Sequence, residues 1–188
     1  LRVAFLEANT GWLPFWLAGM ERDGLLHRWV QQNHDGLPQK AGFPQEKINE
    51  IHGAWFDPSN PVVPFSGSLR RDLFADLVRV EQEVDLCLCA GTSLSGMNAD
   101  RTASTPARKS LEGSALGTVI VNLQETPLDG RSALRVWARC DDAFRLLGDA
   151  LGLSPASVLP PPHDGGPFTV PYDASGIRDE RARTTLDL

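Results

Sequence analysis

Cysteine, clustered basic residues and long apolar runs are all scarce in this chain of 188 residues. Its three cysteines, Cys87, Cys89 and Cys140, are too few for a paired disulfide framework or a four-thiolate zinc site. Because Cys87 and Cys89 lie within an apolar run, we expect a reducing, intracellular compartment. The apolar stretches, such as 84–90, are far shorter than the roughly 20 residues that span a bilayer, which predicts a soluble protein without a membrane partner.

The charge of the chain points away from nucleic acid. The formal net charge is −6, and no run of Lys and Arg offers the clustered positive charge that a phosphate backbone requires. We therefore expect no direct contact with nucleic acid.

What the chain does contain is an alternation of strand and helix patterns. Strands are expected where short apolar runs occur, at 3–6, 26–32, 84–90 and 116–123, with an edge or end strand at 62–63 beside Pro64. Helices are expected where apolar residues recur at helical spacing, at 13–22, 69–84 and 141–151. This alternation predicts an α/β fold, a Rossmann-like parallel sheet with helices on both faces.

The last part of the chain has a different composition. From Ser154 to Leu188 it carries a Pro- and Gly-rich run at 159–167, which denies the backbone helical dihedrals and hydrogen-bond donors. We expect an extended carboxyl-terminal arm over 154–188, through which the chain could join a larger protein assembly.

Small polar residues follow three of the expected strands. Asn33 follows the strand at 26–32, Gly91 opens a Gly-Thr-Ser turn after 84–90, and Asn122 follows the strand within 116–123. In an open parallel sheet the ligand crevice lies beyond the carboxyl ends of the strands, so these residues predict one shared pocket. Glycine lets a backbone approach a ligand, and the hydroxyls and amides can bind ribose or phosphate. Such a pocket suits a nucleotide.

Six segments carry a family resemblance. They are 32–37 (QNHDGL), 40–42 (KAG), 50–53 (EIHG), 62–65 (VVPF), 91–94 (GTSL) and 121–127 (VNLQETP). In order and approximate spacing they resemble the sirtuins, which are NAD-dependent protein deacylases with a Rossmann-like domain. The resemblance runs from about residue 18 to residue 153 and leaves 1–17 outside it as a separate amino-terminal segment.

The resemblance implies a role for individual residues. It makes His52 the general base toward the NAD ribose, and a near-neutral imidazole suits that task. It makes Asn33 and Asp35 catalytic residues at the nicotinamide end. The residues implied to bind NAD are Gln32, Gly91, Thr92, Ser93, Asn122, Cys140 and Asp141, and those implied to clamp the acylated peptide as a strand are Val62, Val63 and Phe65.

The same resemblance implies the reaction. An acyl group leaves a protein lysine for ADP-ribose, nicotinamide is released, and no metal takes part. Two sirtuin features are not found in the sequence: a glycine-rich phosphate loop before Asn33 and a zinc module between His52 and Gly91. These absences leave an alternative open, a catalytically inactive sirtuin-derived scaffold subunit.

Overall fold

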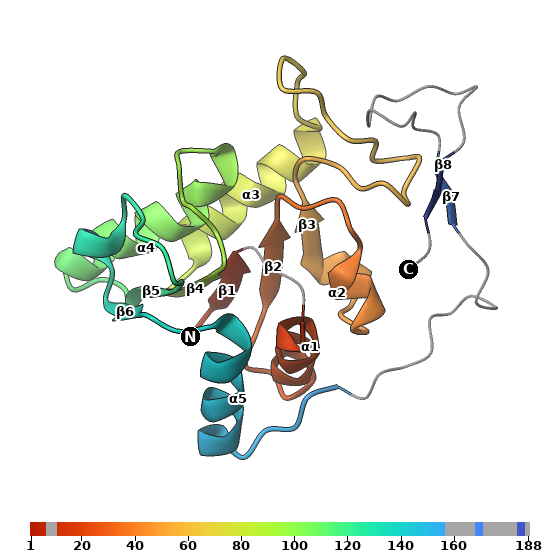
Figure 1. The fold of residues 1–188 in the computed structure, drawn as a ribbon. Helices are drawn as coiled ribbons and strands as arrows, with labels where there is room; N and C mark the ends of the chain where they lie inside the picture. Colours follow the sequence, from red (N-terminus) through yellow and green to blue (C-terminus); the bar gives the residue numbers. More distant parts are fainter. Residues whose placement is uncertain (7–10, 157–167, 171–183, 187–188) are drawn as a thin grey trace.

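The computed structural model describes residues 1–6, 11–156, 168–170 and 184–186. Six parallel strands form one sheet in the order β3-β2-β1-β4-β5-β6, which is the strand order of dinucleotide-binding folds (Figure 1). The strands are β1 Val3–Leu6, β2 Arg28–Gln31, β3 Ile48–Glu50, β4 Leu86–Ala90, β5 Gly117–Val121 and β6 Leu134–Val136. The Rossmann-like fold expected from the sequence is confirmed.

The α-helices of the described residues are α1 Leu13–Arg22, α2 Leu37–Lys40, α3 Arg71–Glu83, α4 Arg101–Leu111 and α5 Cys140–Leu151, with short 3-10 turns at Gln45–Lys47, Asn98–Asp100 and Asp129–Arg131. None of these helices is long and apolar enough to cross a membrane. Two more short strands, β7 Phe168–Val170 and β8 Thr184–Leu186, pair antiparallel with each other. Most of the expected carboxyl-terminal arm lies outside the described residues, and its extended form stays a prediction.

Helices cover both faces of the sheet and give the molecule two cores (Figure 1). Alternate residues of β4 point to opposite faces, as a strand requires, so Leu88 packs with α1 and α5 while Cys89 packs with α3 and α4. Strand β1 alternates in the same way and lies in the middle of the sheet, between β2 and β4. Residues 3–6, which the sirtuin resemblance does not reach, are therefore part of the same sheet as the motifs.

One expected strand is wrong. Val62 and Val63 lie outside any strand, because Pro64 provides no backbone donor beside them and Val63 donates its only amide hydrogen to the carbonyl of His52, over 2.9 Å. Phe65 follows in a turn with its side chain fully exposed. Residues 62–65 are thus hydrogen-bonded to His52 but are not part of the sheet.

A glycine sets the distance between α1 and α5. A Cβ atom at Gly148 would lie 2.1 Å from the Trp16 ring, far inside van der Waals contact. Glycine to alanine inside a helix ordinarily stabilises by about 1 kcal/mol. Here we expect the opposite sign, a loss of about 1–3 kcal/mol of unfolding free energy in Gly148→Ala, because the helices must move apart.

Urea unfolding monitored by circular dichroism measures this loss. Gly130→Ala is the matched control, since a Cβ there meets no atom within 4 Å. A Gly148→Ala protein as stable as the Gly130→Ala protein would show that the two helices do not pack as closely as the structure has them.

Candidate active site

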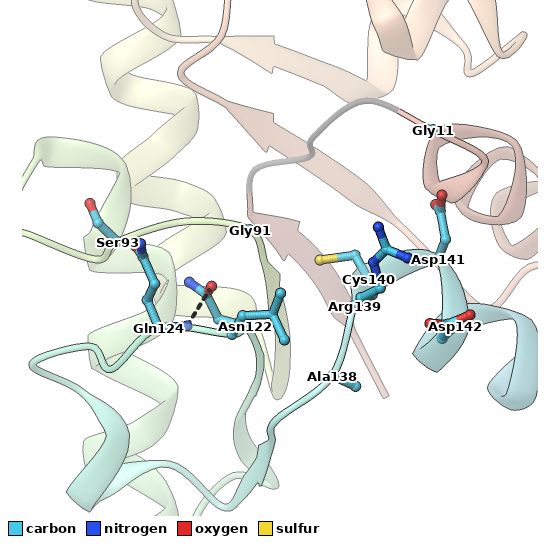
Figure 2. A pocket seen from close by; sticks show the side chains of 11 residues that line it. Gly11, Gly91, Ser93, Asn122, Gln124, Ala138, Arg139, Cys140, Asp141 and Asp142 are labelled. Atoms are coloured by element: carbon cyan, nitrogen blue, oxygen red, sulfur yellow. Dashed lines mark hydrogen bonds between the residues drawn. The ribbon is translucent and has the colours of Figure 1, made fainter.

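A cavity of about 860 Å³ opens at the carboxyl ends of β4, β5 and β6. Its volume is within the range of small-molecule and cofactor sites. Figure 2 shows the lining residues: Gly11, Gly91, Ser93, Asn122, Leu123, Gln124, Ala138, Arg139, Cys140, Asp141 and Asp142. Five of these, Gly91, Ser93, Asn122, Cys140 and Asp141, are residues that the sequence analysis placed at a nucleotide pocket.

Asn122 fixes the two loops that form one wall of the cavity. Its Nδ2 donates to the carbonyl of Thr92 over 2.8 Å. Its Oδ1 accepts the amide of Gln124 over 3.2 Å, as the dashed line in Figure 2 marks. Gly91 adopts a φ of 69°, a value that favours glycine, where the chain leaves β4. Thr92 is buried and its hydroxyl accepts the Leu94 amide over 3.4 Å, so this residue supports the wall and does not line the cavity.

Arg135 holds the loop that follows β5. Its guanidinium donates to the carbonyl oxygens of Asn122, over 2.9 Å, and Gln124, over 2.6 Å, and to the Asp129 carboxylate, over 2.9 Å. The guanidinium also lies 3.6 Å from the centre of the Trp137 ring. Because the planar, multidentate guanidinium reaches several acceptors at once, this one side chain orders the segment that carries Asn122.

We expect Arg135→Lys to lower the free energy of unfolding by about 2–3 kcal/mol, because an ammonium cannot reach the same set of acceptors and leaves some of them unpaired. Denaturant unfolding measures the loss. Arg145→Lys is the control, since Arg145 is exposed and makes only a helical pair with Asp149 among its described contacts. Equal stability of the two variants would mean that Arg135 does not order the loop.

Cys140 and Asp141 begin α5 at the opposite wall. Burial raises the pKa of the half-buried Cys140 thiol and nearby Asp141 raises it further, so the thiol is neutral near pH 7. The Asp141 carboxylate accepts the amide of Leu13 over 2.8 Å and so joins α5 to the start of α1.

Two further predicted residues, Gln32 and His52, lie outside the cavity lining, and both interact with Asp100. Gln32, at the end of β2, donates to the carboxylate of Asp100 over 3.3 Å. Burial lowers the pKa of His52, His34 lowers it further, and Asp100 acts in the opposite direction. His34 Nδ1 also lies 2.8 Å from the carbonyl oxygen of Gly53, the residue after His52. The His52 imidazole is thus within electrostatic reach of a second imidazole and of a carboxylate.

Asn33 and Asp35 lie in the turn between β2 and α2. Asp35 accepts the amide of Leu37 over 3.1 Å, and Gly36 between them has a φ of 68°. Asp35 therefore stabilises the turn, and both residues are half-buried beside His34. The segment from Gly91 to Asp100 connects the two parts of the site, since Gly91 and Ser93 line the cavity and Asp100 acts electrostatically on His52.

Several site residues were not predicted. Gln124, Arg139 and Asp142 line the cavity, and Asp100 acts electrostatically on His52. Arg139 and Asp142 flank Cys140 and Asp141, which were predicted to bind the cofactor. Their position beside these residues is the only sequence feature that could have indicated that they line the cavity. No sequence pattern marked Asp100. Its carboxylate accepts the amides of Gly96 and Met97, which lie in a stretch without hydrophobic periodicity. No group of three or more potential metal ligands occurs among the residues that the structure describes.

The sequence is similar to known deacetylases. It is 26% identical to the NAD-dependent protein deacetylase sirtuin-7 of Rattus norvegicus, over 71% of this chain and 43% of that relative. It is also 26% identical to the NAD-dependent protein deacetylase SRT1 of Arabidopsis thaliana, over 73% of this chain and 36% of that relative. The chain thus spans less than half the length of these curated relatives. No family model matches it.

Several solved Sir2 structures share this fold. One, in complex with the inhibitor EX-527, 2'-O-acetyl-ADP-ribose and deacetylated p53 peptide, has a TM-score of 0.69 at 20% identity, over 82% of this chain and 95% of that chain. A Sir2 complex with p53 peptide and NAD+ has a TM-score of 0.68 at 18% identity, over 81% of this chain and 93% of that chain. The sirtuin resemblance expected from the motifs is confirmed in both sequence and fold.

Proposed function

We propose that the chain is an NAD-dependent protein-lysine deacylase of sirtuin type, which transfers the acyl group of a modified lysine to ADP-ribose and releases nicotinamide. One observation carries the proposal. Residues of the GTSL and VNLQETP segments, which are distant in sequence, line a single cavity at the carboxyl ends of parallel strands in a fold shared with Sir2. The similarity to NAD-dependent deacetylases supports the same activity and gives no support to a non-catalytic scaffold.

The described residues fit the adenosine half of NAD. Gly91 brings backbone to the cavity wall, Ser93 offers a hydroxyl, and Asn122 holds the wall in shape. Cys140 and Asp141 close the cavity from the start of α5. When bound, NAD supplies the ADP-ribose that receives the acyl group. The residues of the chain orient the bound NAD and transfer protons.

His52 is the proposed general base. Burial and the neighbouring His34 lower its pKa, so its imidazole is neutral, and able to accept a proton, at and somewhat below neutral pH. Gln32 ties the Asp100 carboxylate to the end of β2, and that carboxylate favours the imidazolium once a proton has been taken up. Asn33 and Asp35 shape the turn beside His34.

The proposed substrate is an acylated protein or peptide, held along residues 62–65. This segment runs past His52 and is joined to the His52 carbonyl through the amide of Val63. A peptide held along this segment would therefore lie next to the proposed base. A reducing, intracellular compartment and a larger assembly through the carboxyl-terminal arm remain predictions.

The test is to incubate the chain with NAD and an acetyl-lysine peptide and to follow nicotinamide and deacetylated peptide by mass spectrometry. We expect the two products in equal amounts. The same peptide without the acetyl group is the control and should yield neither product in excess of the rate without enzyme. Nicotinamide release that does not depend on the acetyl group would contradict deacylation.

A further inference from the structure

Asp100 is one of two buried carboxylates among the described residues, the other being Glu50. Its side chain lies between β4 and α4, and the residue is 8% exposed. Its Oδ2 accepts the amides of Gly96, over 2.7 Å, and Met97, over 2.9 Å, and its Oδ1 accepts Nε2 of Gln32, over 3.3 Å. Burial of a carboxylate costs free energy, and a neutral asparagine could close the same loop at a lower cost. The charge at this position therefore has a role beyond the structure of the loop.

The hydrogen bonds of Asp100 fasten the loop that follows β4. This loop carries Gly91 and Ser93 on the lining of the cavity. Leu94 in the same loop has a φ of 49°, a left-handed value that bulky residues rarely adopt, and its side chain is buried. Such a backbone persists only where surrounding contacts fix it, and Asp100 supplies two of these contacts. One side chain thereby joins the wall of the cavity to Gln32 at the end of β2.

The charge of Asp100 also acts on the proposed base. The three described donors to Asp100 are uncharged, so they do not offset its negative charge with a cation. Burial lowers the pKa of His52 and the imidazole of His34 lowers it further, whereas Asp100 raises it. These are the two titratable groups of the described residues that act on the His52 imidazole, and they act in opposite directions. Asp100 is thus the one that favours protonated His52.

We propose that Asp100 is a positioning residue of this site, which fastens the cavity loop to Gln32 and holds a fixed negative charge within electrostatic reach of His52. By holding the loop it supports NAD binding, and by its charge it stabilises the imidazolium that forms when His52 takes up a proton. This inference rests on the proposed function, because it takes His52 as the base and the cavity as the NAD site. It goes beyond that function by assigning both effects to one residue that does not line the cavity and to which the family likeness gives no role.

Two variants separate the charge of Asp100 from its hydrogen bonds. Asp100→Asn removes the charge, but its oxygen can still accept the loop amides, and its NH2 group can donate to Gln32 once the Gln32 amide has rotated. Asp100→Ala removes the charge and all three hydrogen bonds. Asp85→Asn is the matched control, because Asp85 also accepts a backbone amide, that of Arg2 over 2.7 Å, and lies at the amino end of β4, opposite the site.

The first experiment measures initial rates with NAD and an acetylated peptide over a range of pH and NAD concentration. We expect Asp100→Asn to keep the KM for NAD, to lower kcat, and to move the acid limb of kcat/KM to lower pH, because His52 loses the charge that favours its protonation. Asp100→Ala should move the same limb and lower kcat/KM by about ten- to a hundredfold, with a raised KM for NAD, because the loop is released. An acid limb that neither variant moves, or a KM for NAD that Asp100→Ala leaves unchanged, would overturn the inference.

A second experiment needs no cofactor and so separates this inference from the proposed function. NMR spectra of the histidine ring protons follow the protonation of His52, whose signal is identified by its loss in His52→Ala. We expect His52 to titrate at lower pH in Asp100→Asn than in the unaltered chain, and at higher pH in His34→Gln, while Asp85→Asn leaves it unchanged. A His52 titration that Asp100→Asn does not lower would overturn the inference, whether or not the chain consumes NAD. A lowered titration in a chain that releases no nicotinamide would uphold the effect of Asp100 on His52 and overturn the proposed function alone.

Discussion

Replacement of His52 by alanine is expected to lower the rate of nicotinamide release by about 10²- to 10⁴-fold, the usual contribution of a general base. The imidazole of His52 is half-buried and lies within electrostatic reach of His34 and Asp100, which is the setting of a proton acceptor and not of a solvated surface residue. The measurement is the initial rate with NAD and an acetylated peptide. His27→Ala is the control, because His27 is exposed before β2.

The pH dependence follows from the lowered pKa of His52. A base must be deprotonated to act, so activity is lost as the pH falls through the pKa of His52. Because that pKa lies below the ordinary histidine value of about 6.5, the acid limb of kcat/KM should lie below pH 6.5. A His52→Ala protein that folds and releases nicotinamide at the unaltered rate would remove this residue from catalysis.

Replacement of Trp29 by alanine is expected to cost about 3–5 kcal/mol of unfolding free energy, the largest loss of stability that we predict. Trp29 lies in β2 with no exposed surface, and its ring packs edge to face on Phe5, with centroids 5.3 Å apart, and on Phe43, 5.2 Å apart. At about 2–4 °C per kcal/mol, the unfolding midpoint should fall by about 6–20 °C. Thermal unfolding measures the shift.

Trp29→Phe separates the packing of the ring from its polar atom. The indole Nε1 of Trp29 is buried and has no hydrogen-bond partner among the described residues. Phenylalanine keeps an aromatic ring in the core and removes that unpaired donor, which offsets part of the lost volume. We expect it to cost far less than alanine does. Equal losses for the two variants would place Trp29 outside the core.

The regular elements were predictable where hydrophobic pattern and length agreed. The helix expected at 13–22 is α1, and the helix expected at 141–151 is α5, which begins at Cys140 and is ended by Gly152, whose φ is 67°. The strand expected at 84–90 is β4, buried on both faces as a central parallel strand must be. Each of these segments could be identified from its own apolar content and length.

Other elements were missed for identifiable reasons. Helix α4 contains Pro106, which ordinarily argues against a helix interior. Strands β3 and β6 have three residues each, too few for any periodicity to show. Val62 and Val63 have strand-forming side chains, yet tertiary contacts take up the Val63 amide before a strand can pair with it.

Several residues of the site could be predicted from the sequence, but the hydrogen bonds that hold them in place could not. Gly91 and Asn122 follow central strands, so the topology of a parallel sheet brings them together. The contact between Asp141 and Leu13 joins residues 128 positions apart, and no local pattern reports it. The same holds for Arg135, whose sequence position gives no sign that it orders the loop of Asn122. Such contacts depend on the three-dimensional arrangement of loops.

The central claim is that NAD binds where the carboxyl ends of β4, β5 and β6 meet the start of α5. Titration of the isotope-labelled chain with NAD, followed by amide chemical shifts in NMR spectra, tests it most directly. We predict shifts concentrated at Gly91, Ser93, Asn122 and Cys140, with smaller ones at His52. Shifts confined to the outer surfaces of α3 and α4, or no shifts at millimolar NAD, would contradict the account.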